Sequence, residues 1–380
     1  MPNRRNFLKS MAVLGAFSAM PSLNVFSQTT NLLKVKSERI FPKRLEQGDL
    51  IGLITPGSPI TEEQLKETVE KLEGMGYKTY YKPSVLSKYG YFAGTDQERA
   101  DELMHMFTNK DVDAIICVRG GYGSIRILDL LDFDQIKANP KIFLGYSDIT
   151  ALLTSIFDRT GLVCFHGPLG ISHFNDYTFK SFENVLVNPK SQYKYPYLRE
   201  ENTEDDPEFD FYTITGGKAK GELIGGNVSV LASMAGSKFE PDFENKIVFL
   251  EEVEEKTYRL DRMLTQLVQA TNLRSANAIV LGVFFKCNIN DKPTLTLKQA
   301  ISDILKPLDI PVAYGFPFGH IKTIMTIPTG INAKFNADRR VLKLLEKAVS
   351  EGQALCERQI HDFRYNDPMV LNNFPAAPTS

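Results

Sequence analysis

Ser147 lies in a short stretch whose pattern is typical of an exposed catalytic serine. The apolar run 142–144 predicts a strand, Gly145-Tyr146-Ser147-Asp148 breaks it, and apolar residues at helical spacing begin at Ile149. Such an elbow exposes the serine hydroxyl at the end of a strand and directs the Asp148 backbone N–H toward an oxyanion. Ile149 replaces the second glycine of the usual G-x-S-x-G elbow. An ordinary helix N-cap at Ser147 or Asp148 is therefore the alternative interpretation.

A glutamate and a histidine later in the chain could activate this serine. Glu251 follows the apolar run 246–250, where a carboxylate is costly to bury without a partner, and His320 follows Pro317-Phe318-Gly319 on a loop. The chain order serine, glutamate, histidine is the order expected of a hydrolase triad, in which the histidine takes the serine proton and the carboxylate holds its tautomer. A lone histidine is also commonly structural, and His166, next to Gly167-Pro168, is the strongest rival base or a substrate contact.

A glycine-rich loop, Arg119-Gly120-Gly121-Tyr122-Gly123, follows the buried run 112–118. It lacks the Gly-Lys-Ser/Thr of a P-loop and the full G-x-G-x-x-G spacing, which argues against nucleotide binding. Gly120 and Gly121 allow the backbone to approach a substrate and to offer N–H donors, although a plain tight turn is the alternative. Arg119 is a candidate partner for a substrate carboxylate, or else forms a structural salt bridge.

The elements around these motifs predict an N-terminal α/β domain over residues 45–170. Short loops join strands at 50–55, 78–81, 112–118, 142–144 and 162–165 to helices at 61–75, 96–109 and 149–157. This alternation indicates a doubly wound parallel sheet of the flavodoxin-like kind. Because sites in such sheets gather at the carboxyl ends of the strands, the loop at 56–58, the glycine loop and the Ser147 elbow are expected to meet there.

The second half of the chain predicts a smaller, mixed α/β domain over residues 218–345. Its expected elements are strands at 220–224, 246–250, 278–283 and 311–314, helices at 228–234, 258–270 and 297–305, and an edge strand at 331–337. Residues 171–217 are predicted to be a linker, with a helix at 175–188 and an acidic, solvated cluster at 200–206. Residues 364–380 are predicted to be a loose tail.

Residues 1–27 have the pattern of an export leader. Arg4-Arg5 and Phe7-Leu8-Lys9 precede a short, weakly apolar run at 10–23, which resembles a twin-arginine signal and is too short for a membrane span. Cleavage is expected near 25–27, and the mature protein is expected to be periplasmic or exported. A disordered basic start or an uncleaved anchor is the alternative interpretation.

The composition fits a soluble globular protein of about two domains, with 380 residues, 43% hydrophobic and 24% charged. The net charge of -2 provides no basic field for nucleic acid. The four cysteines form no CxxC pair, which argues against a zinc ribbon or a redox dithiol. Cys117 and Cys164 lie in apolar runs and are expected to be buried thiols, although a disulfide remains open if the protein is exported.

Several motifs together resemble the LD-carboxypeptidases, the murein tetrapeptide carboxypeptidases of serine peptidase family S66. They occur in the family's order over residues 45–345: Ile54-Thr55-Pro56-Gly57-Ser58, the glycine loop, the Ser147 elbow, Gly225-Gly226-Asn227, Phe249-Leu250-Glu251-Glu252, 259–264, Gly319-His320 and Ile327-Pro328-Thr329-Gly330. Several motifs in order are more specific than any one alone. The family usually has Asp where this chain has Glu252, which makes Glu252 the alternative triad carboxylate, but Glu251 aligns with the family position.

The resemblance implies two domains with the site in the cleft between them, and no metal or cofactor. It implies hydrolysis of the amide between the L-centre of meso-diaminopimelate or lysine and a terminal D-alanine of a murein stem peptide. Ser147 would be the nucleophile, His320 the general base and Glu251 its orienting partner. The backbone N–H groups of Asp148 and the Gly120–Gly121 turn would form the oxyanion hole. Asn227 is expected to contact the substrate, and a homodimer is expected.

Two other functions remain open from the sequence. Relatives of this family hydrolyse amide bonds of peptide–nucleotide antibiotics and confer self-immunity, and their triad motifs would be the same. A non-catalytic protein that binds wall peptides or sugars would use Ser147 and His320 only as polar contacts. The substitution Ser147→Ala separates an enzyme from a binding protein, because only the enzyme would lose its function.

Overall fold

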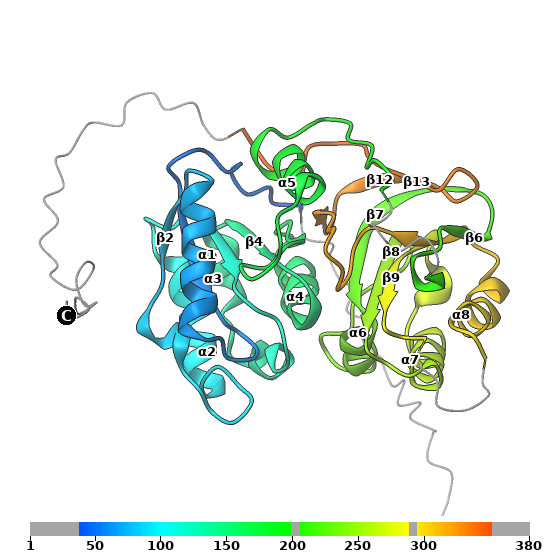
Figure 1. The fold of residues 1–380 in the computed structure, drawn as a ribbon, viewed down its shortest axis with the longest axis horizontal. Helices are drawn as coiled ribbons and strands as arrows, with labels where there is room; N and C mark the ends of the chain where they lie inside the picture. The colour runs from blue at the N-terminus through cyan, green and yellow to red at the C-terminus, as the bar shows by residue number, and fades with distance from the viewer. Residues whose placement is uncertain (1–37, 199–205, 289–294, 352–380) are drawn as a thin grey trace, which may run out of the picture. The chain divides into compact units, whose positions relative to one another are not determined.

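Two β-sheets with flanking helices make up the part of the chain that the computed structural model describes, residues 38–198, 206–288 and 295–351 (Figure 1). The predicted leader at 1–27, the predicted tail at 364–380 and most of the acidic cluster lie outside these described residues.

The first sheet has the strand order β11-β5-β4-β3-β1-β2. Its strands are β1 (Leu50–Ile54), β2 (Lys78–Tyr80), β3 (Ala114–Cys117), β4 (Ile142–Gly145), β5 (Phe165–His166) and β11 (Ile327–Pro328). Strands β1 to β5 are parallel and follow the flavodoxin-like order 2-1-3-4-5, so the predicted doubly wound sheet is confirmed. Strand β11 comes from much later in the chain and pairs antiparallel with β5 at the edge.

Helices cover both faces of the first sheet. They are α1 (Glu62–Gly74), α2 (Asp96–Thr108), α3 (Phe133–Ala138) and α4 (Thr150–Thr160). Capping boxes begin α1 at Thr61 and α2 at Thr95, which explains where these helices start. Alternate strand residues face opposite sides: Ile116 packs in the same core as α1, whereas Ile115 packs with α2, α3 and α4.

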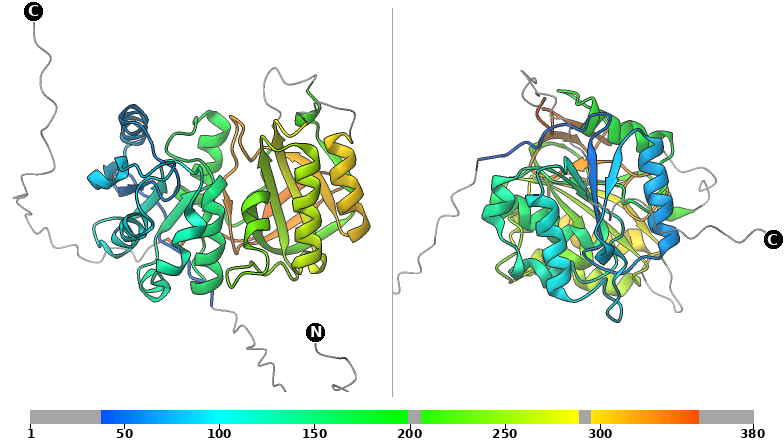
Figure 2. Two further views of the ribbon diagram at one scale, coloured as in Figure 1. Left: turned by 90° about the horizontal axis from the view of Figure 1, so that it is seen from below. Right: turned by 90° about the vertical axis from the view of Figure 1, so that its left-hand side faces the viewer.

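The second sheet has the order β13-β12-β7-β8-β9-β10-β6, and β7 to β10 are parallel to one another. Its strands are β6 (Tyr212–Thr215), β7 (Lys218–Asn227), β8 (Ile247–Val253), β9 (Ala278–Phe285), β10 (Val312–Phe316), β12 (Asn332–Asn336) and β13 (Val341–Leu344). Helices α6 (Val228–Met234), α7 (Thr257–Ala270) and α8 (Leu297–Leu305) lie along one face of it (Figure 2). This mixed arrangement agrees with the predicted fold class.

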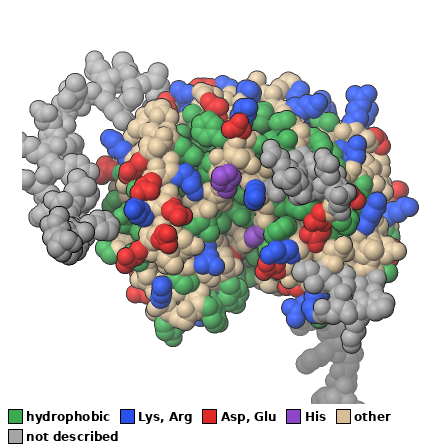
Figure 3. All heavy atoms as spheres, in the orientation of Figure 1, with side chains coloured by type: hydrophobic (Ala, Val, Ile, Leu, Met, Phe, Trp, Pro, Cys, Tyr) green, Lys and Arg blue, Asp and Glu red, His purple; other side chains and the backbone are tan. Residues whose placement is uncertain are grey.

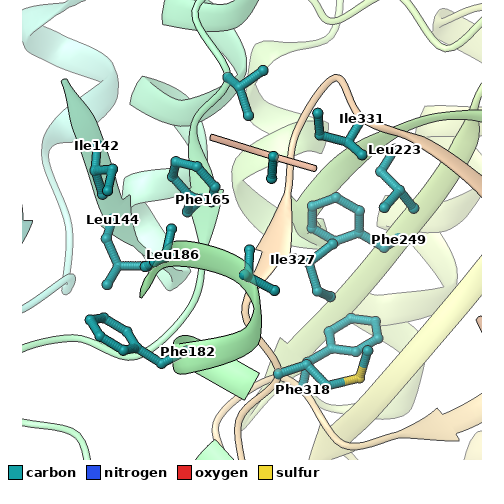
Figure 4. Close-up of a cluster of buried hydrophobic side chains, with 14 of the residues drawn as sticks. Ile142, Leu144, Phe165, Phe182, Leu186, Leu223, Phe249, Phe318, Ile327 and Ile331 are labelled. Carbon is teal, nitrogen blue, oxygen red and sulfur yellow. The ribbon is translucent and has the colours of Figure 1, made fainter. Parts of the chain in front are cut away.

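The opposite face of the second sheet packs toward the first sheet. Along β8, Val248 and Leu250 belong to the core under α7 and α8, while Phe249 belongs to a core shared with strands of the first sheet. Figure 4 shows Phe249 facing Phe165 of β5 and Ile327 of β11 within that shared core. A single apolar core therefore fixes the carboxyl ends of β4 and β8 relative to each other.

Strand β7 (Lys218–Asn227) is longer than the strand predicted at 220–224, because it continues through the Gly225-Gly226-Asn227 motif. Gly225 and Gly226 have φ values of 147° and 143°, which L-residues rarely adopt. A Cβ on Gly225 would lie 1.9 Å from the Phe249 carbonyl oxygen, and one on Gly226 would lie 2.3 Å from Thr150 Oγ1. The glycines thus permit a close approach of β7 to β8 and α4.

Two other predictions need correction. The strand expected at the sheet edge over 331–337 is internal, because Val341–Leu344 forms β13 and pairs antiparallel with β12. The segment 171–217, predicted to be a linker with a helix at 175–188, does contain the helix α5 (Asp176–Phe182), but it also supplies strand β6, which pairs with β10 in the second sheet. Within it Tyr193 and Tyr195 are buried in the shared core, so this part of the segment is packed rather than a solvated linker.

The mixed charge of the surface and the burial of the cysteines agree with what the sequence predicts. On the face drawn in Figure 3, basic and acidic side chains are interspersed rather than separated into one charged field. Cys117, Cys164 and Cys287 are buried free thiols, as expected for the first two, and Cys356 lies outside the described residues. Within residues 38–198, 206–288 and 295–351, no helix combines the length and the apolar character needed to cross a bilayer.

Candidate active site

The backbone at Ser147 has the strained conformation of a nucleophile elbow. Strand β4 ends at Gly145, Ser147 has a φ of 65°, and a 3-10 turn at Ser147–Ile149 leads into α4. A positive φ is rare for a residue with a side chain and occurs where the surrounding structure enforces it. Here the strand, the turn and the helix enforce it, as the sequence pattern predicts.

His320 joins Ser147 to Glu251. Its Nε2 lies 2.9 Å from Ser147 Oγ, and its Nδ1 lies 2.8 Å from Glu251 Oε2. Because an ionised carboxylate only accepts hydrogen bonds, Nδ1 carries the ring proton and Nε2 accepts from the serine hydroxyl. The Tyr146 ring packs edge-on against the imidazole, with 5.0 Å between ring centroids. The structure therefore brings together the three side chains that the sequence nominated as a triad.

The contact between Glu251 and His320 keeps the carboxylate ionised and makes the imidazole more basic. Glu251 is fully buried, and burial alone would raise the pKa of its carboxyl, but the His320 ring outweighs this effect and the pKa is lowered. Burial likewise disfavours a charged imidazole at His320, yet the Glu251 carboxylate raises its pKa above the ordinary histidine value. The carboxylate thereby increases the basicity of the nitrogen that faces Ser147.

Glu252 has a different environment from Glu251. Its carboxylate accepts hydrogen bonds from Asn227 Nδ2 at 3.0 Å and from the backbone N and the Oγ of Ser229, each at 2.8 Å. Burial, together with the nearby Glu251 charge, raises the pKa of this carboxyl. The structure therefore places Glu251, and not Glu252, against His320.

Asn227 does not have the position expected of a substrate contact. It is only 4% exposed, and its Oδ1 accepts from the Val230 backbone N at 3.2 Å as the N-cap of α6. Its Nδ2 donates to Glu252, and its backbone N donates to Thr150 Oγ1 at 3.0 Å. The polar groups of Asn227 are therefore bonded within the protein, where they connect β7 to α6 and α4.

The glycine loop lies directly beside the elbow. A Cβ on Gly120 would be 3.1 Å from Ser147 Cβ and 3.4 Å from the Asp148 backbone nitrogen, so a larger residue here would crowd the elbow. Gly121 follows with a φ of 90°. The Asp148 carboxylate accepts from the Ser124 backbone N at 2.8 Å, and burial raises the pKa of its carboxyl. Asp148 thus ties the loop to the elbow, with its own N–H near the Gly120–Gly121 turn.

A buried arginine that the sequence analysis missed fixes the loops. Arg99 of α2 is 1% exposed, and its Nη1 donates to the carbonyl oxygens of Pro56 and, at 2.9 Å, of Gly123. Its Nη2 bonds Asp96 Oδ1 at 2.5 Å, and the guanidinium lies 4.9 Å from the Phe92 ring centroid. A single arginine within an amphipathic helix gives no sequence signal that it faces inward.

Two other nominated residues have positions that limit their roles. Arg119 is half-buried and donates to the Pro59 carbonyl oxygen at 3.1 Å, and in the described ranges no carboxylate pairs with it. His166 is fully buried, and within the same ranges neither of its ring nitrogens has a hydrogen-bond partner. His320, rather than the rival His166, is therefore the histidine bonded to Ser147.

Comparison with known proteins identifies the family. A family model described as the LD-carboxypeptidase N-terminal domain matches residues 51–167, and one described as the LD-carboxypeptidase C-terminal domain matches residues 220–335. The chain belongs to the LD-carboxypeptidase family. This membership confirms the resemblance seen in the sequence motifs and makes the protein a member of a peptidase family.

Curated relatives cover most of the chain. A probable murein peptide carboxypeptidase of Bacillus subtilis is 36% identical over 312 residues, which are 82% of this chain and 96% of the relative. The murein tetrapeptide carboxypeptidase of Pseudomonas aeruginosa is 31% identical over 298 residues, 76% of this chain and 94% of that one. The microcin C7 self-immunity protein MccF of Escherichia coli is 29% identical over 347 residues, 84% and 99% of the two chains.

Solved structures of the same family share the fold. MccF in complex with glutamyl sulfamoyl guanosine superposes with a TM-score of 0.73 at 28% identity, covering 82% of this chain and 99% of the other. The muramoyltetrapeptide carboxypeptidase of Oxalobacter formigenes gives a TM-score of 0.67 at 30% identity, with coverages of 78% and 97%. Among the described residues of this chain, no cluster of three or more His, Cys, Asp or Glu side chains is arranged to hold a metal ion.

The strained backbone predicts a difference in stability between two variants of Ser147. Because Ser147 has a φ of 65°, Ser147→Gly relieves the strain while Ser147→Ala retains it. We expect Ser147→Gly to be more stable than Ser147→Ala by about 1 kcal/mol in the free energy of unfolding, measured by urea denaturation. Equal stability of the two variants would contradict a strained elbow.

The coupled pair predicts the direction of a titration. The Glu251 carboxylate raises the pKa of His320, so Glu251→Gln removes this effect and leaves burial to lower the pKa of the ring. NMR titration of the histidine ring signals is expected to show His320 titrating at lower pH in Glu251→Gln than in the wild type. In the control Glu252→Gln the shift should be much smaller, since that carboxylate is not bonded to the ring. A larger shift in the control would reverse our assignment of the two glutamates.

Proposed function

We propose that the protein is a serine-type carboxypeptidase that releases the terminal D-alanine from murein tetrapeptide stems. The observation that carries the proposal is the hydrogen-bonded series Ser147–His320–Glu251, built on a strained elbow beside a glycine loop. The two murein carboxypeptidases among the relatives, at 36% and 31% identity, support the class of substrate.

Acylation follows from the geometry. As Ser147 Oγ attacks the carbonyl carbon of the scissile amide, its proton passes to His320 Nε2, 2.9 Å away. The new imidazolium is stabilised by the Glu251 carboxylate on Nδ1. The oxyanion is placed to accept from the backbone N–H groups of Asp148 and the Gly120–Gly121 turn. The carbon–nitrogen bond then breaks, Nε2 returns the proton to the leaving nitrogen, and D-alanine departs from an acyl-serine.

Deacylation uses the same groups in reverse. Water attacks the ester carbonyl while His320 accepts its proton, and the ring then returns that proton to Ser147 Oγ as the ester bond breaks. The product is the tripeptide with a new carboxylate, and the enzyme is restored. Arg119 lies on the glycine loop and donates a hydrogen bond to the Pro59 carbonyl oxygen. It is the cation proposed to bind the carboxylate of the terminal D-alanine.

A second candidate stays within the same chemistry. The likeness to MccF, at 28% identity and a TM-score of 0.73, favours hydrolysis of an amide in a peptide–nucleotide conjugate. The triad would act in the same way on either amide, because the scissile bond is of the same type. The residues that line the substrate-binding surface would then decide which conjugate is bound.

We further propose that the protein acts outside the cytoplasm and assembles as a homodimer. The twin-arginine pattern at residues 1–27 supports export, and murein stem peptides are met outside the cytoplasm. The homodimer is an expectation from the family resemblance.

The proposal predicts the products of one reaction. The peptide L-Ala-D-Glu-meso-diaminopimelate-D-Ala, incubated with the mature protein, should lose one alanine, as detected by mass spectrometry. The same peptide ending in L-alanine should remain intact, because the stereochemistry of the terminal residue sets where its carboxylate lies. Ser147→Ala should reduce the rate at least about a thousandfold, since the nucleophile is removed.

The controls separate the two candidates. Release of glutamate from glutamyl sulfamoyl guanosine, with the tetrapeptide intact, would favour the conjugate hydrolase over the carboxypeptidase. Loss of alanine with Ser147→Ala at the wild-type rate would remove Ser147 from the mechanism.

A further inference from the structure

His166 is a buried titratable side chain that the proposed mechanism does not use. It is 0% exposed at the end of β5, where it pairs with Gly145 of β4 and Ile327 of β11. Within the described residues, Nδ1 and Nε2 are both buried without a hydrogen-bond partner. Buried polar atoms are almost always satisfied in folded proteins, so two such atoms on one ring require an explanation.

The surroundings of the ring are aromatic and lie beside the triad. The imidazole centroid is 5.3 Å from the Phe249 ring, 5.8 Å from Tyr146 and 6.0 Å from Phe318. Tyr146 also packs against the His320 ring, with 5.0 Å between centroids, so one tyrosine contacts both histidines. This apolar setting lowers the pKa of His166 to about 4, which keeps the ring neutral at physiological pH.

One carboxylate oxygen of Glu251 is also buried without a hydrogen-bond partner among the described residues. Glu251 Oε2 bonds His320, whereas Glu251 Oε1 is buried and has no hydrogen-bond partner within the described residues. Phe249 and Glu251 are alternate residues of β8, so the strand places the carboxylate on the side where His166 packs against Phe249. A neutral imidazole has one N–H, and an ionised carboxylate has only acceptors.

We infer that His166 is a positioning residue, whose neutral ring stabilises the charged Glu251 carboxylate at Oε1, the oxygen that does not bond His320. The two groups interact either directly, after a small side-chain movement, or through one internal water. This inference rests on the proposed serine mechanism, because it assigns His166 a role only through Glu251 and His320. His166 does not touch the substrate or the reacting atoms in this role.

The charged and titratable groups around the pair fix the sign of the effect. His166 faces Glu251 and His320; Glu251 also neighbours Glu252, and His320 also senses Glu252 and Glu254. The active form of the pair has one negative charge, on Glu251, and an N–H near that charge stabilises it. Loss of the His166 N–H therefore raises the apparent pKa at which the pair takes up a proton.

Three substitutions of His166 test this role. His166→Phe keeps a planar ring and removes both nitrogens, whereas His166→Asn and His166→Gln place an amide N–H near the positions of Nδ1 and Nε2. We expect His166→Phe to raise the apparent pKa of the Glu251–His320 pair by about one unit, which lowers kcat about tenfold on the acid side of the profile and little above it. At least one amide variant is expected to restore the wild-type pKa.

The readouts do not depend on one another. NMR titration of the His320 ring gives the pKa without any substrate, and the pH profile of kcat with the tetrapeptide gives it in the reaction. His105→Phe is the matched control, because His105 lies on α2 and bonds Tyr80 away from the triad. It should leave both readouts unchanged.

Clear results would overturn the inference. One is an unchanged pKa and kcat in His166→Phe, and another is an equal pKa shift in His166→Phe and both amide variants, which would show a packing role alone. Should His166→Phe fail to fold, wild-type pKa values in both amide variants would support the inference, and shifts in both would overturn it. Absence of tetrapeptide turnover by the wild type would overturn the proposed function and leave the ring titration to decide the role of His166.

Discussion

The imidazole of His320 has a hydrogen bond on each ring nitrogen, and its two partners come from different sheets. Ser147 follows β4 of the first sheet and Glu251 lies on β8 of the second, so the series exists only while the two sheets keep one relative position. A hydrogen bond is confined to a narrow range of distances and weakens steeply when its donor–hydrogen–acceptor angle falls below about 120°. The proton transfers proposed for the reaction therefore depend on how rigidly the sheets are joined.

Several features of the fold provide that rigidity. Strand β11 leaves the second half of the chain and adds to the edge of the first sheet, next to β5. The shared core places Phe165 and Ile327 against Phe249, two residues before Glu251. On the other side of the elbow, Thr150 of α4 accepts a hydrogen bond from the Asn227 backbone at the end of β7. These contacts hold the elbow and the glutamate strand from both sides.

The sequence predicted the local chemistry well, because each motif is short and has a direct physical meaning. The elbow at Ser147, the buried strand that carries Glu251 and the loop that carries His320 follow from apolar runs, glycines and chain breaks. Strand β8 itself continues two residues past Glu251, to Val253. The choice of Glu251 over Glu252 rested on the family motif, because strand alternation indicates only that the two side chains point to opposite faces of the sheet. In the structure Glu251 is the one that bonds His320. The parallel order of the first sheet also followed from the alternation of strands and helices.

Features that depend on contacts between distant segments were not visible in the sequence. Asn227 is a polar residue in a glycine motif, which suggested a substrate contact. Its bonds to Glu252 and to the start of α6 appear only once β7 and β8 are paired. Arg99 is indistinguishable from a solvated helix residue until the carbonyls of Pro56 and Gly123 surround it. Strand β11 is two residues long, too short for any periodicity to reveal it.

The activation of Ser147 can be measured without knowing the substrate. The folded protein is treated with a small fluorophosphonate, which forms a bond only with an activated hydroxyl, and the modified residue is located by peptide mass spectrometry. The account predicts a single modification at Ser147 in the wild type, with little or none in His320→Ala. Modification at another serine, or equal modification of Ser147 in both proteins, would contradict the claim that His320 and Glu251 activate this hydroxyl.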